Sequence, residues 1–191
     1  MIAKTIAIFL LAVSASAERD ETCPGIKSRN NWGARTPTTV TYQTFPVPNV
    51  IIHHTVTPVC TTFRSCATQA KSIQRYHQTS KKWPDIAYNF LVGNDGNVYE
   101  GVGWHKVGTH MSGYNKNSIG IAFIGDFNDK LPSRAAMKAA KDLIQCGVQL
   151  GEISVDYDLY AARQLQSTES PGLTLYAEIQ DWDNWKATPN K

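Results

Sequence analysis

Two adjacent histidines, His53 and His54, are the residues of this chain most suited to chemistry. They follow three β-branched residues at positions 50–52 and precede Thr55. Turn-forming residues bound this apolar run on both sides, which is typical of a short buried strand. Such a strand would carry two imidazoles to the edge of a sheet, where they could bind a metal ion or another ligand. The alternative is one packed and one solvated histidine, and this stretch alone does not decide between the two.

The elements that must position these histidines alternate along the chain. The expected strands span residues 50–54, 86–93, 98–100, 118–125 and 157–161, and the expected helices span 64–80, 131–149 and about 174–182. Ser133 is the expected N-cap of the second helix. Residues 23–38 are expected to be irregular and to be pinned by Cys23 and Trp32. This pattern predicts an α/β fold, a single domain with a mixed central β-sheet packed by about three α-helices.

The N-terminus has the pattern of a secretory signal peptide. Lys4 precedes an apolar run over residues 6–13, and the following Ser-Ala-Ser-Ala predicts cleavage after Ala17. The run is shorter than the ~20 residues that cross a bilayer. We therefore expect residues 1–17 to be removed and residues 18–191 to form one secreted, extracellular domain with no membrane segment. Loss of Lys4 lowers the formal charge from +3 to +2, and no basic cluster indicates a nucleic-acid partner.

Four cysteines in a secreted chain predict two disulfides. Cys60 and Cys66 enclose a short loop before a helix, so we pair them. This leaves Cys23 with Cys146, which would tie the N-terminal arm to a later helix. Spacing alone does not prove this connectivity. A zinc finger is disfavoured because no CxxC spacing occurs.

Several other polar residues could lie near the histidine pair. His77 ends the apolar face of the first expected helix, where an imidazolium would stabilise the helix C-terminus. Alternatively, His77 lines the same groove as His53 and His54. Residues 85–90, 108–110 and 166–172 are further stretches that we expect to converge on this groove.

Six motifs give the chain a resemblance to a known family. They are Val-Ile-Ile-His-His-Thr at 50–55, Tyr-His at 76–77, Asp-Ile-Ala-Tyr-Asn-Phe at 85–90, Gly-Asn-Val-Tyr-Glu-Gly at 96–101, Gly-Ile-Ala-Phe-Ile-Gly at 120–125 and Thr-Glu-Ser-Pro-Gly at 168–172. The chain resembles the peptidoglycan-recognition proteins, which are related to phage-type zinc N-acetylmuramoyl-L-alanine amidases. The motifs lie in order along a domain-length stretch. The resemblance therefore implies an amidase-like fold for the whole mature chain.

The resemblance also implies that the zinc site of the family is incomplete in this chain. Hydrolytic members of that family hold zinc with two histidines and one cysteine, and a tyrosine assists. The matching positions here are His53 for the first ligand, Ala162 for the second, Ser170 for the third and Tyr88 for the tyrosine, with Thr168 in the motif of the third ligand. Alanine cannot bind zinc, and a neutral serine hydroxyl is a poor ligand for it. We therefore predict a degenerate amidase site with no zinc, no other cofactor and no enzymatic activity.

Ser170 has a structural interpretation instead. The Ser-Pro pair suits a helix N-cap with Pro171 at the first helical position. A nucleophilic role is disfavoured because no Gly-x-Ser-x-Gly elbow surrounds Ser170 and no base is assigned to it.

The expected function is then binding of an anionic stem peptide and its sugar, which needs hydrogen-bond donors, an aromatic platform and a cation. The residues expected to bind it are His54, Thr55, His77, Lys81, Lys82, Trp83, Tyr88, Val102, His110 and Asn115. Tyr88 could instead belong to the core, and the two lysines could form a solvated loop.

Two of these positions bear on the type of stem peptide. Relatives that prefer the diaminopimelate stem tend to carry Gly-Trp where this chain has Lys82-Trp83, and an arginine where it has Val102. Lys82-Trp83 also departs from the Asn-Phe of relatives that prefer the lysine stem. Valine cannot pair with the extra carboxylate of diaminopimelate. The resemblance therefore favours lysine-type peptidoglycan.

Within the family, residues 170–176 look most like the short secreted insect members of the SA type. Such a relative senses bacteria in haemolymph and triggers a serine-protease cascade leading to Toll signalling or prophenoloxidase activation. The implied partners are bacterial peptidoglycan, a glucan-recognition or Gram-negative-binding-type protein and a modular serine protease. The competing hypotheses are a cell-wall hydrolase with an altered active site and a binder of another microbial glycan.

Overall fold

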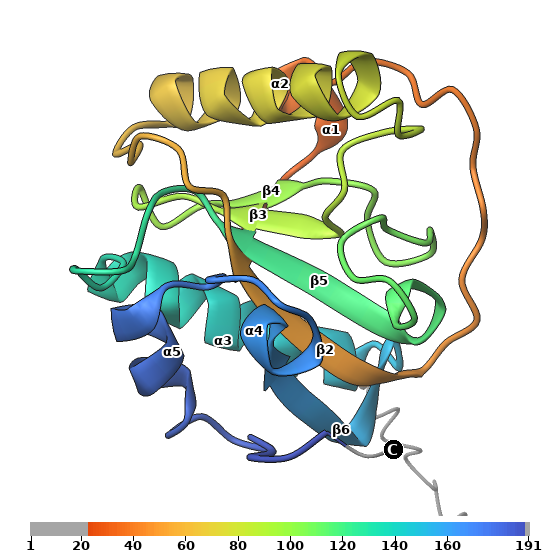
Figure 1. Ribbon diagram of the computed structural model, residues 1–191. Coiled ribbons are helices and arrows are strands. Elements are labelled where there is room, and N and C mark those ends of the chain that lie inside the picture. Colours follow the sequence, from red (N-terminus) through yellow and green to blue (C-terminus); the bar gives the residue numbers. More distant parts are fainter. Residues whose placement is uncertain (1–22, 190–191) are drawn as a thin grey trace, which may run out of the picture.

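A six-stranded sheet in the order β1-β4-β3-β5-β2-β6 organises residues 23–189, the part of the chain that this computed structural model describes (Figure 1). The strands are β1 (Ile26–Lys27), β2 (Val47–His54), β3 (Phe90–Val92), β4 (Val98–Glu100), β5 (Ser118–Phe123) and β6 (Ile153–Ala161). Neighbouring strands are parallel except β3 and β4, which form an antiparallel hairpin. The predicted mixed sheet is therefore confirmed, and the predicted signal peptide lies outside the described residues.

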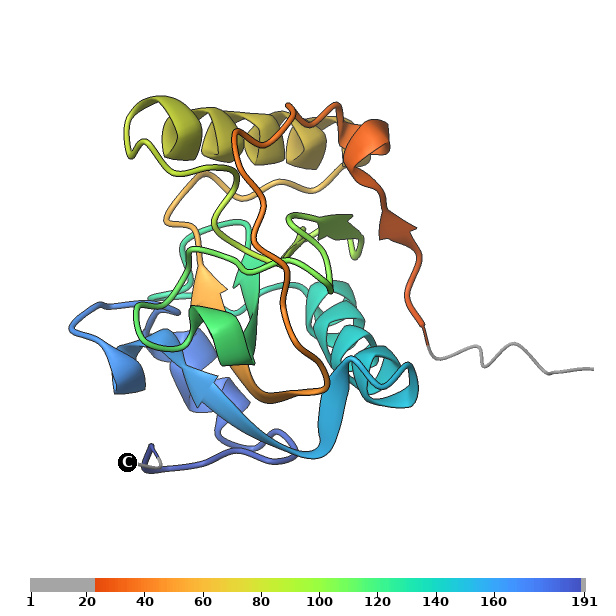
Figure 2. The same ribbon diagram turned by 90° about the vertical axis from the view of Figure 1, so that its right-hand side faces the viewer.

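Helices cover both faces of this sheet (Figure 2). They are α1 (Arg29–Trp32), α2 (Phe63–Thr79), α3 (Arg134–Gln149), α4 (Ala162–Leu165) and α5 (Leu173–Ile179), and a 3-10 turn, η1 (Asn115–Asn117), precedes β5. Ser133 is the N-cap of α3, as predicted, because its hydroxyl accepts a hydrogen bond from the N–H of Ala136 at 3.0 Å. No helix among residues 23–189 is long and apolar enough to cross a membrane.

The larger core lies between the sheet and the pair α3 and α5. Val50 and Ile52 of β2 contribute to it, together with Ile121 of β5, Leu143 of α3 and Leu175 of α5, all fully buried. Burial of one such side chain contributes roughly 1.5–3 kcal/mol. This layer holds β2 firmly from one side, so that its other side can carry functional groups.

The opposite face of the sheet is covered unequally. Helix α2 packs Ala70 and Ile73 onto the half that includes Leu91 and Tyr99. Over the β2 half lies only a small cluster that contains Ile51. Because side chains alternate along a strand, His53 points to the same face as Ile51. The uneven cover therefore leaves room above His53.

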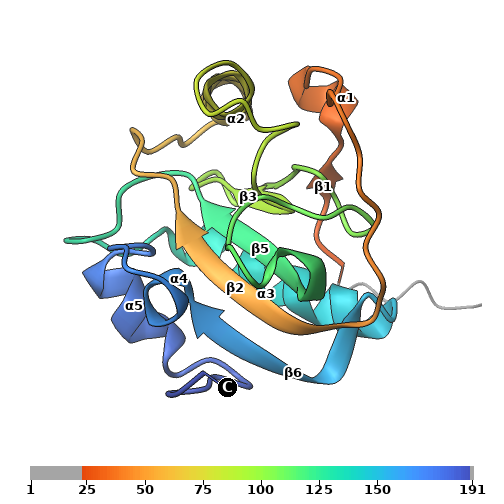
Figure 3. The same ribbon diagram turned by 45° about the vertical axis from the view of Figure 1, so that its right-hand side comes forward.

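The N-terminal arm, residues 23–46, runs over the surface from β1 through α1 and down to β2 (Figure 3). A disulfide joins Cys23 to Cys146 of α3, and a second joins Cys60 to Cys66, so both predicted pairings are confirmed. Trp32 is 1% exposed and donates its indole N–H to the carbonyl of Glu100 at 2.9 Å. The two predicted pins of this segment are thus present, although the segment is less irregular than expected because it includes β1 and α1.

Several predicted element boundaries were wrong. The strand expected over residues 86–93 shortens to β3, because Asn89 bonds through its side chain to the carbonyls of Gly103 and Lys106 and to the N–H of Gly120. These bonds shape a loop before β3, and this loop carries Tyr88. Strands β2 and β6 begin earlier than expected, whereas α5 ends three residues before Trp182.

Candidate functional site

A groove of about 650 Å³ lies over the end of β2, between α2 and the segment that follows α4. Its lining residues are His53, His54, Thr55, Val56, Tyr76, His77, Lys81, Trp83, Tyr88, His110, Met111, Ala162, Gln166, Ser167, Thr168, Glu169 and Ser170. The groove therefore brings together the five positions matched to the amidase centre and seven of the ten expected ligand-binding residues. Neutral polar and aromatic groups predominate in this lining, which suits a ligand with both polar and apolar parts.

Three expected binding residues lie outside the groove lining. Val102 is 6% exposed in the apolar cluster under α2, and it lines a separate cavity of about 100 Å³. Lys82 is exposed and has a positive φ of 60°. Asn115 contacts two lining residues: its side-chain oxygen accepts hydrogen bonds from the backbone N–H groups of His110 and Met111 at 2.9 and 2.8 Å. Asn115 thus supports the loop that carries His110.

His53 and His110 form a pair at the floor of the groove. Nε2 of His53 lies 3.1 Å from Nδ1 of His110. The hydroxyl of Ser118 donates to the carbonyl of Tyr114 at 2.7 Å, so its lone pairs face Nε2 of His110 at 3.5 Å. This arrangement assigns the His110 proton to Nε2 and makes His53 the donor to His110. Nδ1 of His53 then remains as an acceptor with no hydrogen bond among the described residues.

Both members of this pair are neutral at physiological pH. Burial lowers the pKa of His110 to about 3, and burial, followed by the repulsion that a protonated His110 or His54 would exert, lowers the pKa of His53 well below its usual value. The floor of the groove therefore offers hydrogen bonds without a positive charge.

His54 points away from His53 at the end of β2. Its Nδ1 accepts from the N–H of Phe127 at 3.3 Å, so the proton sits on Nε2, which is buried and has no hydrogen-bond partner among the described residues. Burial lowers the pKa of His54, against the raising effect of Asp126, whose carboxylate lies 3.8 Å away. The His54 backbone N–H donates to the hydroxyl of Ser170 at 3.1 Å.

His77 lines the groove and does not cap α2 as an imidazolium. Its Nδ1 accepts the N–H of Ala87 at 3.0 Å, which requires a neutral ring with the proton on Nε2. Burial, followed by the nearby Lys81, lowers the pKa of His77 to about 4. His77 and His53 line the same groove, which agrees with the alternative interpretation of His77.

A pH dependence of stability follows from His77. In the unfolded chain His77 binds a proton below about pH 6.5, whereas in the folded chain it does so only below about pH 4. The free energy of unfolding therefore falls as the pH drops from about 6.5 to about 4. The expected loss from this group is up to about 3 kcal/mol. We expect His77→Gln to remove this part of the slope when urea unfolding is measured at several pH values. Equal slopes for both proteins would contradict the assignment of a neutral His77.

Trp83 and Tyr88 form the aromatic side of the groove. The Trp83 ring lies 4.9 Å from the His77 ring, and the Tyr88 ring lies 5.3 Å from that of His53. Tyr88 also packs against the core under α2, and burial raises its pKa to about 12. The two interpretations of Tyr88, core residue and groove residue, therefore both describe it.

The predicted helix-capping role of Ser170 and Pro171 was wrong. Helix α5 begins at Leu173 with Gly172 as its N-cap. Gly172 has φ of 95°, and a Cβ there would lie 2.5 Å from the backbone of Phe127, so the chain turns into the helix at this glycine. The Ser170 hydroxyl instead holds the end of β2 through the N–H of His54.

The groove residues do not fit a catalytic zinc ion. Of the three positions matched to ligands, only His53 carries a zinc-binding group, since Ala162 has no donor atom and the Ser170 hydroxyl is neutral. Within residues 23–189, no group of three His, Cys, Asp or Glu side chains is placed to hold a metal ion.

Three lining residues were not foreseen as part of the site, and one of them is Tyr76, which is 51% exposed on α2. Met111 is 2% exposed and packs with Ile51 and Ala162, beside His110. Val56 is 64% exposed and follows Thr55 at positive φ. Their only signal in the sequence was position, because each directly precedes or follows a residue that was already assigned to the site.

Comparison with known proteins agrees with the fold. The sequence model of the N-acetylmuramoyl-L-alanine amidase family matches residues 43–173. The chain is 51% identical over 187 residues to peptidoglycan-recognition protein SA of Drosophila melanogaster, covering 96% of this chain and 92% of that protein. These findings define the class of protein as an amidase-type α/β domain.

Solved structures narrow this class. The structure of the Drosophila SA protein matches with a TM-score of 0.86 and 54% identity, over 88% of this chain and 97% of that one. Peptidoglycan-recognition protein LE, solved in complex with tracheal cytotoxin, a monomeric diaminopimelic acid-type peptidoglycan, matches with a TM-score of 0.83 and 44% identity, over 84% of this chain and 95% of that one. The chain belongs to the peptidoglycan-recognition proteins.

Proposed function

We propose that the groove binds the muramyl stem peptide of bacterial peptidoglycan and leaves it uncut. The observation that carries this proposal is the composition of the groove, in which His53 remains while Ala162 and Ser170 replace the other two zinc ligands. Such a site keeps the recognition surface of an amidase and lacks the donors for its metal. The relative solved with a peptidoglycan fragment supports the choice of ligand.

The groove offers a set of hydrogen-bonding groups that suits a peptide. The free Nε2–H of neutral His77 can donate to a ligand carbonyl or carboxylate, and Nδ1 of His53 can accept from a ligand amide. Lys81 supplies a positive charge, and Trp83 supplies an apolar platform. The backbone of a stem peptide carries both N–H donors and carbonyl acceptors. The donor on His77 and the acceptor on His53 can therefore both form hydrogen bonds with it.

We further propose a preference for the lysine-type stem. No arginine is among the described residues that line the groove, and Val102 is buried in a different cavity. A second carboxylate, as in diaminopimelate, would therefore lack a bidentate partner in the groove. This preference is tested by comparing the two stem types in the same assay.

In the organism we propose secretion and a signalling role, in which the bound protein triggers a serine-protease cascade of the Toll or prophenoloxidase type. The proposed protein partners are a Gram-negative-binding-type protein and a modular serine protease. The similarity to an insect recognition protein over most of the chain supports this role. A residual amidase activity is the second candidate, because the amidase family match spans residues 43–173.

The binding proposal is tested by sedimentation with insoluble peptidoglycan. We expect the protein to sediment with peptidoglycan, more strongly with the lysine type, and a soluble muramyl pentapeptide to compete. Trp83→Ala should reduce the bound fraction severalfold, because it removes the aromatic platform. Tyr42→Ala is the matched control, since Tyr42 is 76% exposed and lies outside the groove lining. Absence of sedimentation with either type would refute the proposal.

A further inference from the structure

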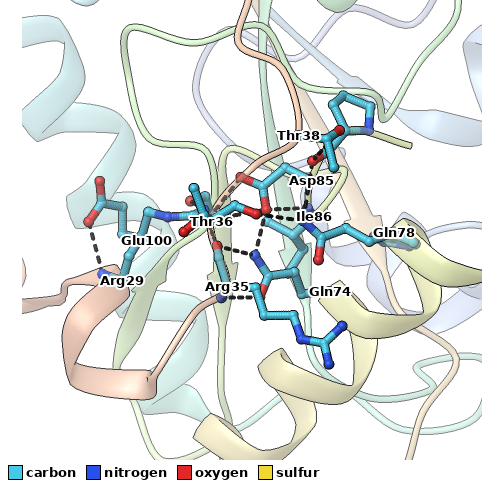
Figure 4. A network of polar contacts seen from close by, with 12 residues as sticks. Arg29, Arg35, Thr36, Thr38, Gln74, Gln78, Asp85, Ile86 and Glu100 are labelled. Atoms are coloured by element: carbon cyan, nitrogen blue, oxygen red, sulfur yellow. Dashed lines mark hydrogen bonds and ion pairs between the residues drawn. The ribbon is translucent and has the colours of Figure 1, made fainter. Parts of the chain in front are cut away.

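A largely buried ion pair joins the N-terminal arm to a loop that borders the groove (Figure 4). Nη2 of Arg29 lies 2.9 Å from Oδ2 of Asp85 and 3.2 Å from Oδ1. The side chains are only 16% and 6% exposed. The same guanidinium donates to the carbonyls of Gly101 and Arg35. A planar guanidinium with several fixed acceptors is held in one orientation.

Asp85 accepts further hydrogen bonds, besides those from Arg29 (Figure 4). Its Oδ1 accepts from Nε2 of Gln74 at 2.6 Å and from the N–H of Ile86 at 2.7 Å. Gln74 is buried on α2 and also bonds to the backbone of Arg35, accepting its N–H at 2.8 Å and donating to its carbonyl at 3.0 Å. One carboxylate therefore connects the N-terminal arm, α2 and the chain at Ile86.

Residues 83–88, here called the wall loop, have Trp83 and Tyr88 at their two ends, and both of these side chains line the groove. Between them, His77 accepts the N–H of Ala87 on its ring and that of Trp83 on its carbonyl. The Ala87 carbonyl accepts from the N–H of Thr109 at 2.8 Å, next to His110. The wall loop is thus held by His77 on one side and by Asp85 on the other.

The ion pair stabilises the wall loop because Arg29 neutralises the buried carboxylate of Asp85. Without Arg29, the Asp85 carboxylate would remain buried without a cation, which is strongly unfavourable. The loop can relieve this by carrying Asp85 toward water, which breaks the bond of Asp85 to Gln74. Such a movement would displace the residues on both sides, including Trp83 and Tyr88.

We propose that Arg29 and Asp85 are positioning residues for the groove. Their ion pair sets the wall loop so that Trp83 and Tyr88 face the ligand, an inference that rests on the proposed binding function. Arg29 lies outside the amidase match at residues 43–173. The N-terminal arm is therefore part of the binding unit, although none of its residues lines the groove.

The test compares variants of the full mature chain. Arg29→Met should lower affinity for a soluble muramyl pentapeptide about tenfold. Hydrogen exchange should show lost protection at the amides of Ile86 and Ala87 before it changes in α3. Arg29→Met with Asp85→Asn should recover much of the affinity, because asparagine keeps an acceptor for Gln74 and Ile86 without leaving a buried charge. Arg29→Lys is the milder variant and should fall between wild type and Arg29→Met.

Two controls separate positioning from loss of stability. Lys138→Met breaks an exposed pair with Asp142 on α3 and should change nothing. Ile144→Val lowers stability from the opposite face of the sheet and should leave the affinity unchanged. If Arg29→Met and Arg29→Lys keep wild-type affinity and exchange at Ile86 and Ala87, the positioning role is wrong. If wild type itself does not bind, the proposed function fails, whereas the exchange data still report on the wall loop.

Discussion

Replacing Ala162 with histidine and Ser170 with cysteine in one chain is expected to create a zinc site. His53 would be the third ligand, and the Nε2–H that it donates to His110 is the outer hydrogen bond that a metal-bound histidine needs. The introduced thiol would replace a hydroxyl that now accepts the N–H of His54, and this donor would favour the thiolate. We expect one zinc per chain with submicromolar affinity, which corresponds to about 8 kcal/mol or more.

Metal analysis after dialysis, with and without a chelator, measures this result. The single variants Ala162→His and Ser170→Cys are the controls, and each should bind zinc at least about a hundredfold more weakly, because two protein ligands make a poor site. A folded double variant that binds no zinc would show that the three positions do not form the centre that the family resemblance implies.

Gly120→Ala is expected to disturb the floor of the groove. A Cβ at Gly120 would lie 2.5 Å from the His110 ring. That ring has little freedom to move, because Nδ1 of His110 bonds to His53 and the backbone N–H of His110 bonds to Asn115. Overpacking of this kind costs about 1–3 kcal/mol. We expect a lower free energy of unfolding and a loss of muramyl-peptide affinity of about tenfold or more.

Gly25→Ala is the matched control for Gly120→Ala, since a Cβ at Gly25 meets no atom within 4 Å. Urea unfolding and calorimetric titration measure the two effects. Wild-type affinity in folded Gly120→Ala would mean that the pair of His53 and His110 does not shape the binding surface.

Much of the fold could be predicted because its signals are local. The β-branched run before His53 and the apolar face of α3 are periodic patterns, and both gave the correct elements. The disulfides followed from the short loop between Cys60 and Cys66, which left one pairing for the other two cysteines. Seven expected binding residues line the groove because they follow or precede elements that end at the same place.

The remaining features depend on contacts between distant parts of the chain. The bonds from the Asn89 side chain, not propensity, decide where β3 begins. Ser170 looked like a helix cap, but the approach of Phe127 to Gly172 moves the helix start to Leu173. The sequence did not indicate a role for Arg29, because its partner Asp85 is 56 residues away along the chain.

Recognition of the muramyl peptide without cleavage is tested most directly by one titration. Soluble lysine-type muramyl pentapeptide is titrated into the protein in chelator-treated buffer with and without added zinc, and the recovered ligand is analysed by mass spectrometry. We expect saturable binding of one peptide per chain, equal with and without zinc, and recovery of intact ligand. Release of free stem peptide, or binding that requires zinc, would contradict it.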